Sequence, residues 1–502
     1  MTVLTLVIFL PLAAALALLA VPRPGHRAVL AVWIAATAAD LALVAAMWAR
    51  HGTSGTGRIA FETNARWIPS VGAGYHVGVD GLSLPLLALT ALLFAACAVY
   101  SLRQTYRIRA FAVLFLFLET VCLGLFAALD LLLFFVFFDL SIVGMYAVIL
   151  LWGHGDRARS ALKFFLYTFL GSLILLLGFI GLYLGADPHT FDMAELIRRP
   201  PLEGSPGLAG LTLLAIGTGL AIKTPVVPFH TWLPPAHTDA PAAGSAILAG
   251  VMLKMGTYGL VRIAMPMLPD AWRRYAWVPL AVGLLSVLYG ALVALAQENL
   301  KRLVAYTSVN HMGYIVLALG AAGYASGDAA ARRLAVTGAV TQMVSHGLVT
   351  GSLFLLCGVL YDRGRSYDLG RYGGLARGAP VFAALTAVAA FASLGLPGLS
   401  GFIAEFQIFT GAIGGGSTPA AVAAAVSVLG ILITAALFLR VLHRAVLGEP
   451  GELTGRVTDV RRPELAAVVP LLALSLAIGV APRPLLDTIE PVSAAVVALV
   501  AR

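Results

Sequence analysis

The stretch AIKTPVVPFHTWLP, residues 221–234, places a lysine inside an apolar segment, two residues before a proline. A charge is costly in any apolar surrounding, and most costly if that surrounding is lipid. Pro225 and Pro228 remove helix hydrogen bonds and free the carbonyls of the preceding turn. A helix must therefore break where polar side chains or water can satisfy those carbonyls. We interpret Lys223 as a functional group beside a broken helix.

The composition indicates that the surrounding is a membrane. The 502 residues are 60% hydrophobic and 11% charged, with a mean hydropathy of +0.93, which is far more apolar surface than a soluble core can hide. The sequence does not show the short segments of alternating apolar and polar residues that a transmembrane β-barrel requires. We predict an all-α integral membrane protein with about 14 transmembrane helices, at 3–21, 28–48, 84–102, 110–128, 131–152, 161–184, 208–229, 243–264, 276–296, 303–322, 335–360, 380–410, 419–440 and 464–482.

The distribution of positive charge predicts the orientation. The net charge is +9, and 19 of the 33 Lys and Arg residues fall in alternate loops that would face the cytoplasm if the N-terminus lies outside. This is the positive-inside bias, and it favours both termini on the outer face. The first apolar run lacks a basic segment before it and is long enough to span a bilayer, so we expect a retained helix. The net positive charge is therefore explained by orientation in the membrane, and we do not expect nucleic-acid binding.

The sequence offers no seat for a cofactor or a metal. Cys97, Cys122 and Cys357 stand alone inside apolar runs, with none of the spacings that hold zinc, haem iron or an iron–sulfur cluster. No glycine-rich phosphate loop follows a strand. We therefore expect any chemistry of this chain to proceed without a bound redox centre.

Ionisable residues at membrane depth carry the functional hypothesis, because such groups normally face a bundle interior or a water-filled path. Those near the middle of predicted helices are Asp40, Glu119, Asp139, Lys223, Lys254, His311, His346 and Glu405.

Lysine usage singles out two of these residues. The chain has 29 Arg but only four Lys, and Lys223 and Lys254 lie within predicted helices. Arginine stays protonated in proteins, whereas a lysine in an apolar surrounding can release and regain its proton. We therefore predict that both lysines carry protons. The alternative is that they are structural ion-pair partners.

A second helix interruption is predicted in SLGLPGLSGFIAEF, residues 393–406. Pro397, Gly398 and Gly401 precede Glu405 there. Two interrupted helices, five helices apart, are typical of an inverted-repeat transporter with its ion site at the interruptions. The alternative is that each proline is an ordinary kink.

At this point the chain resembles the antiporter-like subunits of respiratory complex I, most nearly the M type. The resemblance runs from about residue 75 to 450 and is most specific at 221–263. It rests on YHVGVDGLSLPL (75–86), ALKFFLYTFLGSLILLLG (161–178), AIKTPVVPFHTWLPPAHTDAPAAGSAILAGVMLKMGTYGLVRI (221–263), LKRLVAYTSVNHMGYIVLALG (300–320) and SGFIAEF (400–406).

The resemblance implies a domain organisation. N-terminal helices and an outer loop at 49–83 occupy residues 1–109, a first five-helix repeat occupies 110–264, and an inverted repeat occupies 276–440. Residues 441–502 then hold a loop, the fourteenth helix and a short C-terminal tail.

The resemblance also implies roles along a polar axis at the membrane midplane. Lys223 would take up and pass a proton, with Asp139 as its acidic partner. Lys254 would relay the proton to the second half, His311 and His346 would be the next stations, and Glu405 the terminal group. The two histidines titrate near neutral pH, although a hydrogen-bonding role within the bundle is the alternative.

Two features bear on the place within the family. Glutamate at 405, and a chain ending about twenty residues after the fourteenth helix, are typical of the M type, whereas the L and N types carry lysine at that position. The family's residue at 139 is ordinarily glutamate, and here it is aspartate. The shorter side chain leaves open an electron donor other than NADH.

Four lesser candidates complete the set. Glu119 is a second carboxylate near Asp139 or a packing residue. We expect Asp40, outside the proposed repeats, to be structural. His230 and His237 flank WLPP and are either entry-side buffers or interfacial residues.

The resemblance implies a proton-translocating subunit of a redox-driven complex in the bacterial plasma membrane. Quinone and NADH, or another donor, would be used by partner subunits, and L-type and N-type subunits would be its neighbours. The alternatives are a subunit of a Na⁺(K⁺)/H⁺ antiporter and a subunit of a hydrogenase-linked membrane complex. Sodium-dependent transport without an electron donor would favour the antiporter.

Overall fold

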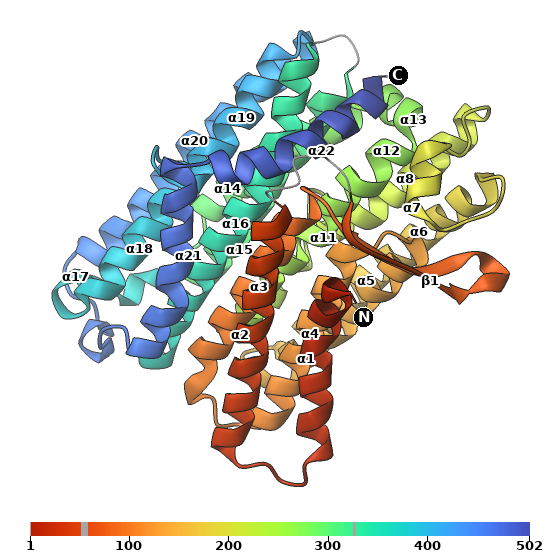
Figure 1. Ribbon diagram of the computed structural model, residues 1–502. Helices are drawn as coiled ribbons and strands as arrows, with labels where there is room; N and C mark the ends of the chain where they lie inside the picture. Colours follow the sequence, from red (N-terminus) through yellow and green to blue (C-terminus); the bar gives the residue numbers. More distant parts are fainter. Residues whose placement is uncertain (1, 52–58, 325–327, 502) are drawn as a thin grey trace.

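A computed structural model describes residues 2–51, 59–324 and 328–501. The chain is predominantly helical (Figure 1), and fourteen of the described helices are long and apolar enough to cross a membrane. The predicted fold class is confirmed. Because no helix of this kind can satisfy its polar backbone from lipid, each closes its own hydrogen bonds along its length.

The first four long helices form a group at the N-terminal end of the chain, drawn in red and orange in Figure 1. In it α1 packs against α4, and α2 packs against both α3 and α4. Their bounds are α1 Val3–Ala20, α2 His26–His51, α3 Ser83–Tyr100 and α4 Ile108–Ala127, with a short turn η2 Ser101–Arg103.

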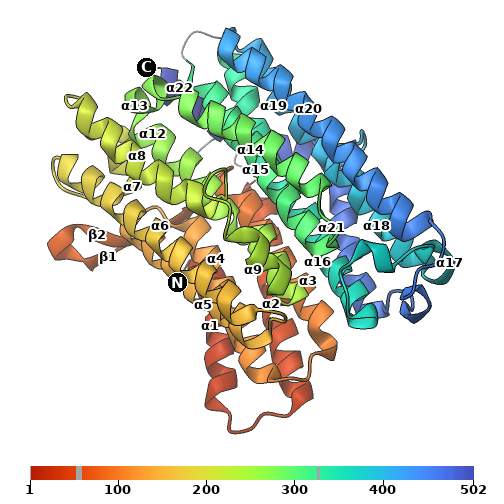
Figure 2. The same cartoon turned by 180° about the vertical axis from the view of Figure 1, so that it is seen from behind.

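A β-hairpin projects from the side of the bundle in both views (Figures 1 and 2). Strands β1 Ala60–Ile68 and β2 Ala73–Val79 pair antiparallel around the turn η1 Pro69–Val71. The hairpin lies in the predicted outer loop 49–83, of which residues 52–58 are outside the described residues. It is the exception to an all-helical chain, and sequence reasoning did not anticipate it.

The next segment begins where Asp130 caps α5, its carboxylate accepting from the backbone N–H groups of Leu132 and Leu133. Helix α6 then packs against α8 (Figure 2). The bounds are α5 Leu131–Trp152, α6 Arg157–Gly185, α7 Met193–Arg198, α8 Pro206–Lys223 and α9 Leu233–Asp239.

Residues 242–267 form one membrane-length helical stretch that contains two π-helical segments. The segments are α10 Ala242–Ile247, η3 Leu248–Met252, α11 Lys254–Gly259, η4 Leu260–Ala264 and α12 Met265–Met267, with both π segments at η3 and η4. π-helical turns are frequent at functional sites. Lys254 lies between them.

The remaining helices follow α13 Pro269–Arg274. Helices α14 and α15 share the most extensive helix–helix contact, and α20 lies against α14. The bounds are α14 Trp277–Leu295, α15 Leu300–Gly323, α16 Ala329–Gly364, η5 Leu369–Arg371, α17 Leu375–Gly378, α18 Pro380–Ser393, α19 Ser400–Gly414, α20 Thr418–Val441, η6 Leu442–Leu447, η7 Thr454–Arg456, α21 Arg462–Val480 and α22 Arg483–Ala501.

Three predicted segments differ from the structure. The helix predicted at 208–229 ends at Lys223, because Pro225 and Pro228 cannot continue its hydrogen bonds. The span predicted at 380–410 is two shorter helices, α18 and α19. The expected short C-terminal tail is the helix α22, which contacts α16, α12 and α13 (Figure 1). The predicted and observed numbers of membrane-length helices are both fourteen, but the two sets differ. Among the described helices, α22 is one of the fourteen, and the predicted span 380–410 is not.

Candidate functional site

Lys223 is the last residue of α8, and its side chain is only 1% exposed. Its Nζ donates to Ser141 Oγ on α5 at 2.9 Å and lies 4.7 Å from the centre of the Phe138 ring. The expected partner, Asp139, is half-buried and interacts with the charge of Lys223. The carboxylate of Asp139 and the ammonium group of Lys223 are not within ion-pair distance of each other. The hydrogen bond of Lys223 goes to Ser141 instead. Sequence reasoning missed Ser141, which is two residues beyond Asp139.

The interruption after Lys223 is held by hydrogen bonds from outside the helix. Trp232 Nε1 donates to the carbonyl of Ile222 at 2.9 Å, and the backbone N–H of Val227 donates to Ser286 Oγ on α14 at 2.9 Å. These contacts supply partners that the prolines deny to the helix. The end of α8 also lies against α11, where a Cβ added at Gly256 would collide with Thr224. Lys223 and Lys254 are thus on adjoining elements.

Lys254 is fully buried and bonds to two groups. Its Nζ donates to the carbonyl of Ala249 at 2.5 Å and lies 2.6 Å from Nδ1 of His346 on α16. The ring of His346 lies 5.4 Å, centre to centre, from the ring of His311 on α15. The structure therefore brings three predicted site residues from three helices into one continuous group.

His311 connects this group to the second interruption. Its Nε2 lies 3.0 Å from the carbonyl oxygen of Ser393, the last residue of α18. The chain then turns through Gly395, whose φ of +75° is strained for residues with a Cβ, and a Cβ there would collide with the carboxylate of Glu405. Pro397 and Gly398 lie in the same turn, before α19 begins at Ser400. Glu405 is therefore 6% exposed and packed against the turn.

His237 and His230 lie at different places in the bundle. His237 is fully buried, stacks on Phe354 at 4.5 Å, and interacts with the charges of Lys254 and Lys301. The ring of His230 packs edge-on against the ring of Tyr289, with the centres 5.0 Å apart. Among the described residues, the charge that interacts with His230 is that of Lys163.

Lys301 is a buried lysine that sequence reasoning assigned to a loop. It is 0% exposed, donates to the carbonyl of Ala240, and lies 5.2 Å from the centre of the Tyr367 ring. The available signal was its rarity, since only four lysines occur in the chain. It extends the charged group around His237 toward the end of α9.

Glu119 on α4 is fully buried and close enough to Asp40 on α2 for their charges to interact. The sequence placed Asp40 outside the polar axis with a structural role. The structure instead places it beside one of the candidate carboxylates.

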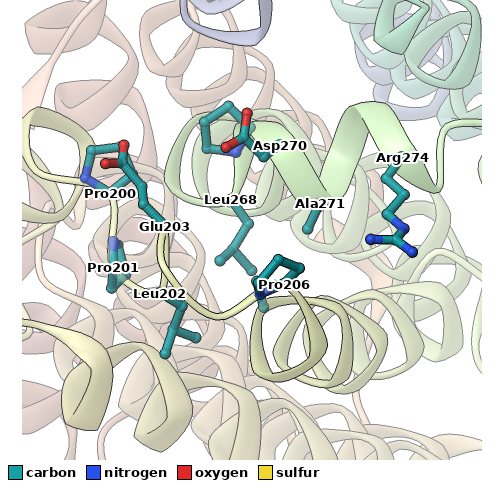
Figure 3. A pocket seen from close by; sticks show the side chains of 11 residues that line it. Pro200, Pro201, Leu202, Glu203, Pro206, Leu268, Asp270, Ala271 and Arg274 are labelled. Carbon is teal, nitrogen blue, oxygen red and sulfur yellow. The ribbon is translucent and has the colours of Figure 1, made fainter.

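Two cavities lie away from these residues. One of about 170 Å³ lies between the α7–α8 connection and α13 and is lined by Leu202, Glu203, Leu268, Asp270 and Arg274, among others (Figure 3). The other, of about 650 Å³, lies between α2, α3, α16 and α21 and has an apolar lining. Neither cavity includes a predicted site residue.

A histidine outside the membrane-spanning segments links the β-hairpin to the bundle. Nδ1 of His76 lies 2.5 Å from Asp192 Oδ2, and its Nε2 lies 2.8 Å from Glu62 Oε1. Burial lowers the pKa of His76, but the hydrogen bonds to Asp192 and Glu62 outweigh it and raise this pKa above its ordinary value of 6.5. An imidazolium ring can donate to both carboxylates at once.

We expect the His76 contact to be sensitive to pH. A histidine whose pKa is higher in the folded state stabilises fully below about pH 6.5, and this stabilisation is lost as the pH rises through the folded-state value. His76→Gln should lower the resistance of the hairpin to limited proteolysis at pH 6, with a difference that shrinks toward pH 9. A constant difference across this range would contradict the ionic contribution. Thr63→Ser, on β1, is the control.

The geometry so far defines a class of protein. Membrane-length helices enclose lysine, histidine and carboxyl groups. One helix, α8, ends at Lys223, and another, α18, ends at Ser393, whose carbonyl contacts His311. Side chains of this kind can take up and release protons, and a membrane protein retains them at depth when it moves ions or protons. We therefore assign the fold and site to the ion-translocating membrane proteins.

Comparison with known proteins narrows this class. The family model described as "NADH:quinone oxidoreductase/Mrp antiporter, TM" matches residues 128–434. NADH-quinone oxidoreductase subunit M of Rickettsia prowazekii is 37% identical over 431 residues, covering 85% of this chain and 84% of the relative. Subunit M of Rhodobacter capsulatus is 36% identical, covering 97% and 95%.

A solved structure gives the same result. A chain of respiratory complex I from Thermus thermophilus with bound NADH is 30% identical and superposes with a TM-score of 0.88, with 99% of both chains covered. The chain belongs to the family of NADH-quinone oxidoreductase subunit M, as the quoted motifs predicted.

Proposed function

We propose that this chain is a proton-translocating membrane subunit of a redox-driven NADH-quinone oxidoreductase. Its relatives at 36–37% identity bear the name of subunit M of that enzyme. NADH and quinone are then used by partner subunits, and this chain supplies a path for protons. The observation that carries the proposal is the hydrogen-bonded pair of Lys254 and His346, fully enclosed by membrane-length helices.

The proposed path runs from α5 to α19. Asp139 interacts with the charge of Lys223, and Ser141 accepts a hydrogen bond from the Nζ of Lys223. When a charge elsewhere in the complex moves toward or away from Asp139, the proton affinity of Lys223 changes. The lysine then releases or takes up its proton. Two charged residues a few ångströms apart in an apolar surrounding interact far more strongly than in water.

The middle of the path is the contact between Lys254 and His346. At 2.6 Å, Nζ of the lysine and Nδ1 of the histidine can hold one proton between them, because the neutral histidine accepts where the protonated lysine donates. His311 is the next group, and its ring faces both His346 and the carbonyl of Ser393. Glu405, beyond the turn at Gly395, is the terminal carboxylate.

Two peripheral groups join this path. His237 interacts with Lys254 and His346 on one side and with Lys301 on the other, which supports an entry branch from the end of α9. His230 contributes a secondary station near Tyr289. Both belong to the path as side groups.

The organisation of the chain within the membrane follows from the same proposal. Residues 110–264 and 276–440 form two inverted repeats, one interrupted after Lys223 and the other after Ser393. Both termini lie on the outer face of a bacterial plasma membrane, as the charge distribution favours. L-type and N-type subunits are its neighbours, and exposed apolar faces such as Leu170 and Leu177 on α6 are available to lipid or to them.

Replacing Lys254 tests the proposed function. Lys254→Met keeps a long side chain but carries no proton. A positioned proton donor contributes about 10²–10⁴-fold to the transfer step. We therefore expect proton uptake driven by NADH oxidation to fall by about ten-fold or more in membrane vesicles that contain the intact complex.

Met255→Leu, at the next buried position, is the matched control. It should leave proton uptake unchanged. Proton uptake at the wild-type rate in Lys254→Met would contradict the path, provided that the complex assembles to the wild-type level.

The second candidate is exchange of Na⁺ or K⁺ for protons without a redox partner. Its support is that the matching family description also names an antiporter. Sodium-driven proton movement in vesicles without an electron donor would favour it, and proton uptake that requires NADH and quinone would favour the first.

A further inference from the structure

Asp40 on α2 and Glu119 on α4 are a buried carboxyl pair. Both side chains are 0% exposed, and none of their four carboxyl oxygens has a hydrogen-bond partner among the described residues. The helices that carry them pack directly against each other, and the two charges interact. Buried polar groups in native proteins nearly always have a partner, so an orphaned pair requires an explanation.

Among the described residues, no positively charged side chain is found to interact with Glu119. The ionisable groups whose charges interact with Glu119 are Asp40, Cys97 on α3 and Cys122 on α4. Helix α1, which packs against α2 and α4, contains no ionisable side chain. Two carboxylates side by side in an apolar surrounding cannot both remain ionised. The pair must therefore hold at least one proton.

The pair is connected to the lysine of the proposed path. Helix α4, which carries Glu119 and Cys122, packs against α5, and Lys223 donates to Ser141 on α5. The charges of Glu119 and of Lys223 both interact with Cys122. Lys223 in turn interacts with Asp139 on α5.

Further orphaned polar atoms lie on the same two helices. Thr120 Oγ1, beside Glu119 in sequence, and Trp33 Nε1, two turns before Asp40, are buried and have no partner among the described residues.

We propose that Asp40 and Glu119 share a proton and form a side branch of the proton path, joined to Lys223 past Cys122. The branch rests on the proposed function. The pair alternates between one proton and two: the ionised carboxylate takes up a second proton, and this second proton is released toward Lys223 when that lysine has lost its own, while the first proton stays on the pair. The N-terminal helices α2 and α4 thereby take part in proton storage.

Infrared-monitored pH titration of the purified intact complex tests the shared proton. The difference between wild type and the double variant Asp40→Asn/Glu119→Gln isolates the carbonyl band of the protonated pair. Removing one carboxyl removes the like charge that opposes ionisation of the other. We expect the band that remains in Asp40→Asn, and likewise in Glu119→Gln, to disappear at a pH about one unit or more below the wild-type midpoint.

Thr37→Val, one turn from Asp40 on α2, is the matched control and should titrate as wild type. Midpoints that stay at the wild-type value in both single variants would overturn the shared proton. So would a band that persists in every protein up to the pH at which the complex dissociates, because such groups exchange no proton.

Proton uptake separates this inference from the proposed function. The double variant should translocate fewer protons per NADH oxidised than wild type, and more than Lys223→Arg. Wild-type uptake in the double variant would overturn the branch alone. Wild-type uptake in Lys223→Arg would instead overturn the central path, while the infrared titration would still report on the pair.

Discussion

Replacing Lys223 with arginine is expected to lower proton translocation strongly while leaving a positive charge in place. Arginine remains protonated in proteins, so Lys223→Arg keeps the attraction to Asp139 but removes the ability to release the proton. A proton-transfer group contributes about 10²–10⁴-fold to its step, and we expect proton uptake to fall by about ten-fold or more. Coupled electron flow from NADH to quinone should fall with it.

A second variant, at the hydrogen-bond acceptor of Lys223, sharpens this result. Ser141→Ala removes the hydrogen-bond acceptor 2.9 Å from Nζ but leaves the lysine, so its effect should be much smaller. Electron flow and proton uptake are to be recorded together on vesicles with matched amounts of assembled complex. If Lys223→Arg retains both at the wild-type level, the lysine is a structural cation and the path does not pass through it.

Breaking the ion pair between Arg363 and Glu464 gives the largest expected loss of stability. Arg363, near the end of α16, makes two bonds to the carboxylate that begins α21, at 2.7 and 3.1 Å. Their side chains are 3% and 6% exposed. Without Arg363, the cation that remains beside Glu464 is the more exposed Arg461, 4.0 Å away. Removing one partner of a buried pair costs about 3–5 kcal/mol.

Arg363→Leu should therefore lower the free energy of unfolding of the purified protein in detergent by about that amount. The double variant Arg363→Leu/Glu464→Leu removes both charges and should recover much of the loss. Equal losses in the single and double variants would show that the packing of the arginine stem, and not the ion pair, carries the stability.

The sequence predicted the helical architecture well, because that architecture follows from local patterns. The central site residues stay a prediction that rests on patterns of the same kind. Apolar runs give spans directly, and Pro225 beside Lys223 marks the end of a helix without knowledge of its neighbours. The resemblance gave Asp139 its role as the partner of Lys223, and in the structure the charges of these two residues interact. These features are properties of one segment at a time.

The missed features depend on segments far apart in the chain. Lys301 follows a helix end and was taken for a loop charge, but the carbonyl of Ala240 and the ring of Tyr367 enclose it. Asp40 gains its importance only because α4 brings Glu119 against it. The hydropathy of the sequence reveals neither of these two pairings. The break in the predicted span 380–410 was signalled by Pro397 and Gly398, but the sequence did not reveal that the two halves are separate short helices.

The hydroxyl of Ser400, at the start of α19, lies 2.7 Å from Ser345 on α16 and 2.7 Å from Ser475 on α21. Helices leave the ribosome in chain order, so α18 and α19 enter the bilayer well before α21. During that interval the Ser400 hydroxyl has only one of its two protein partners, at a helix end where lipid offers no substitute. The second interruption is therefore completed during biogenesis by a residue 75 positions downstream. Its final geometry is a late event in membrane insertion, set by a helix that lies outside both proposed repeats.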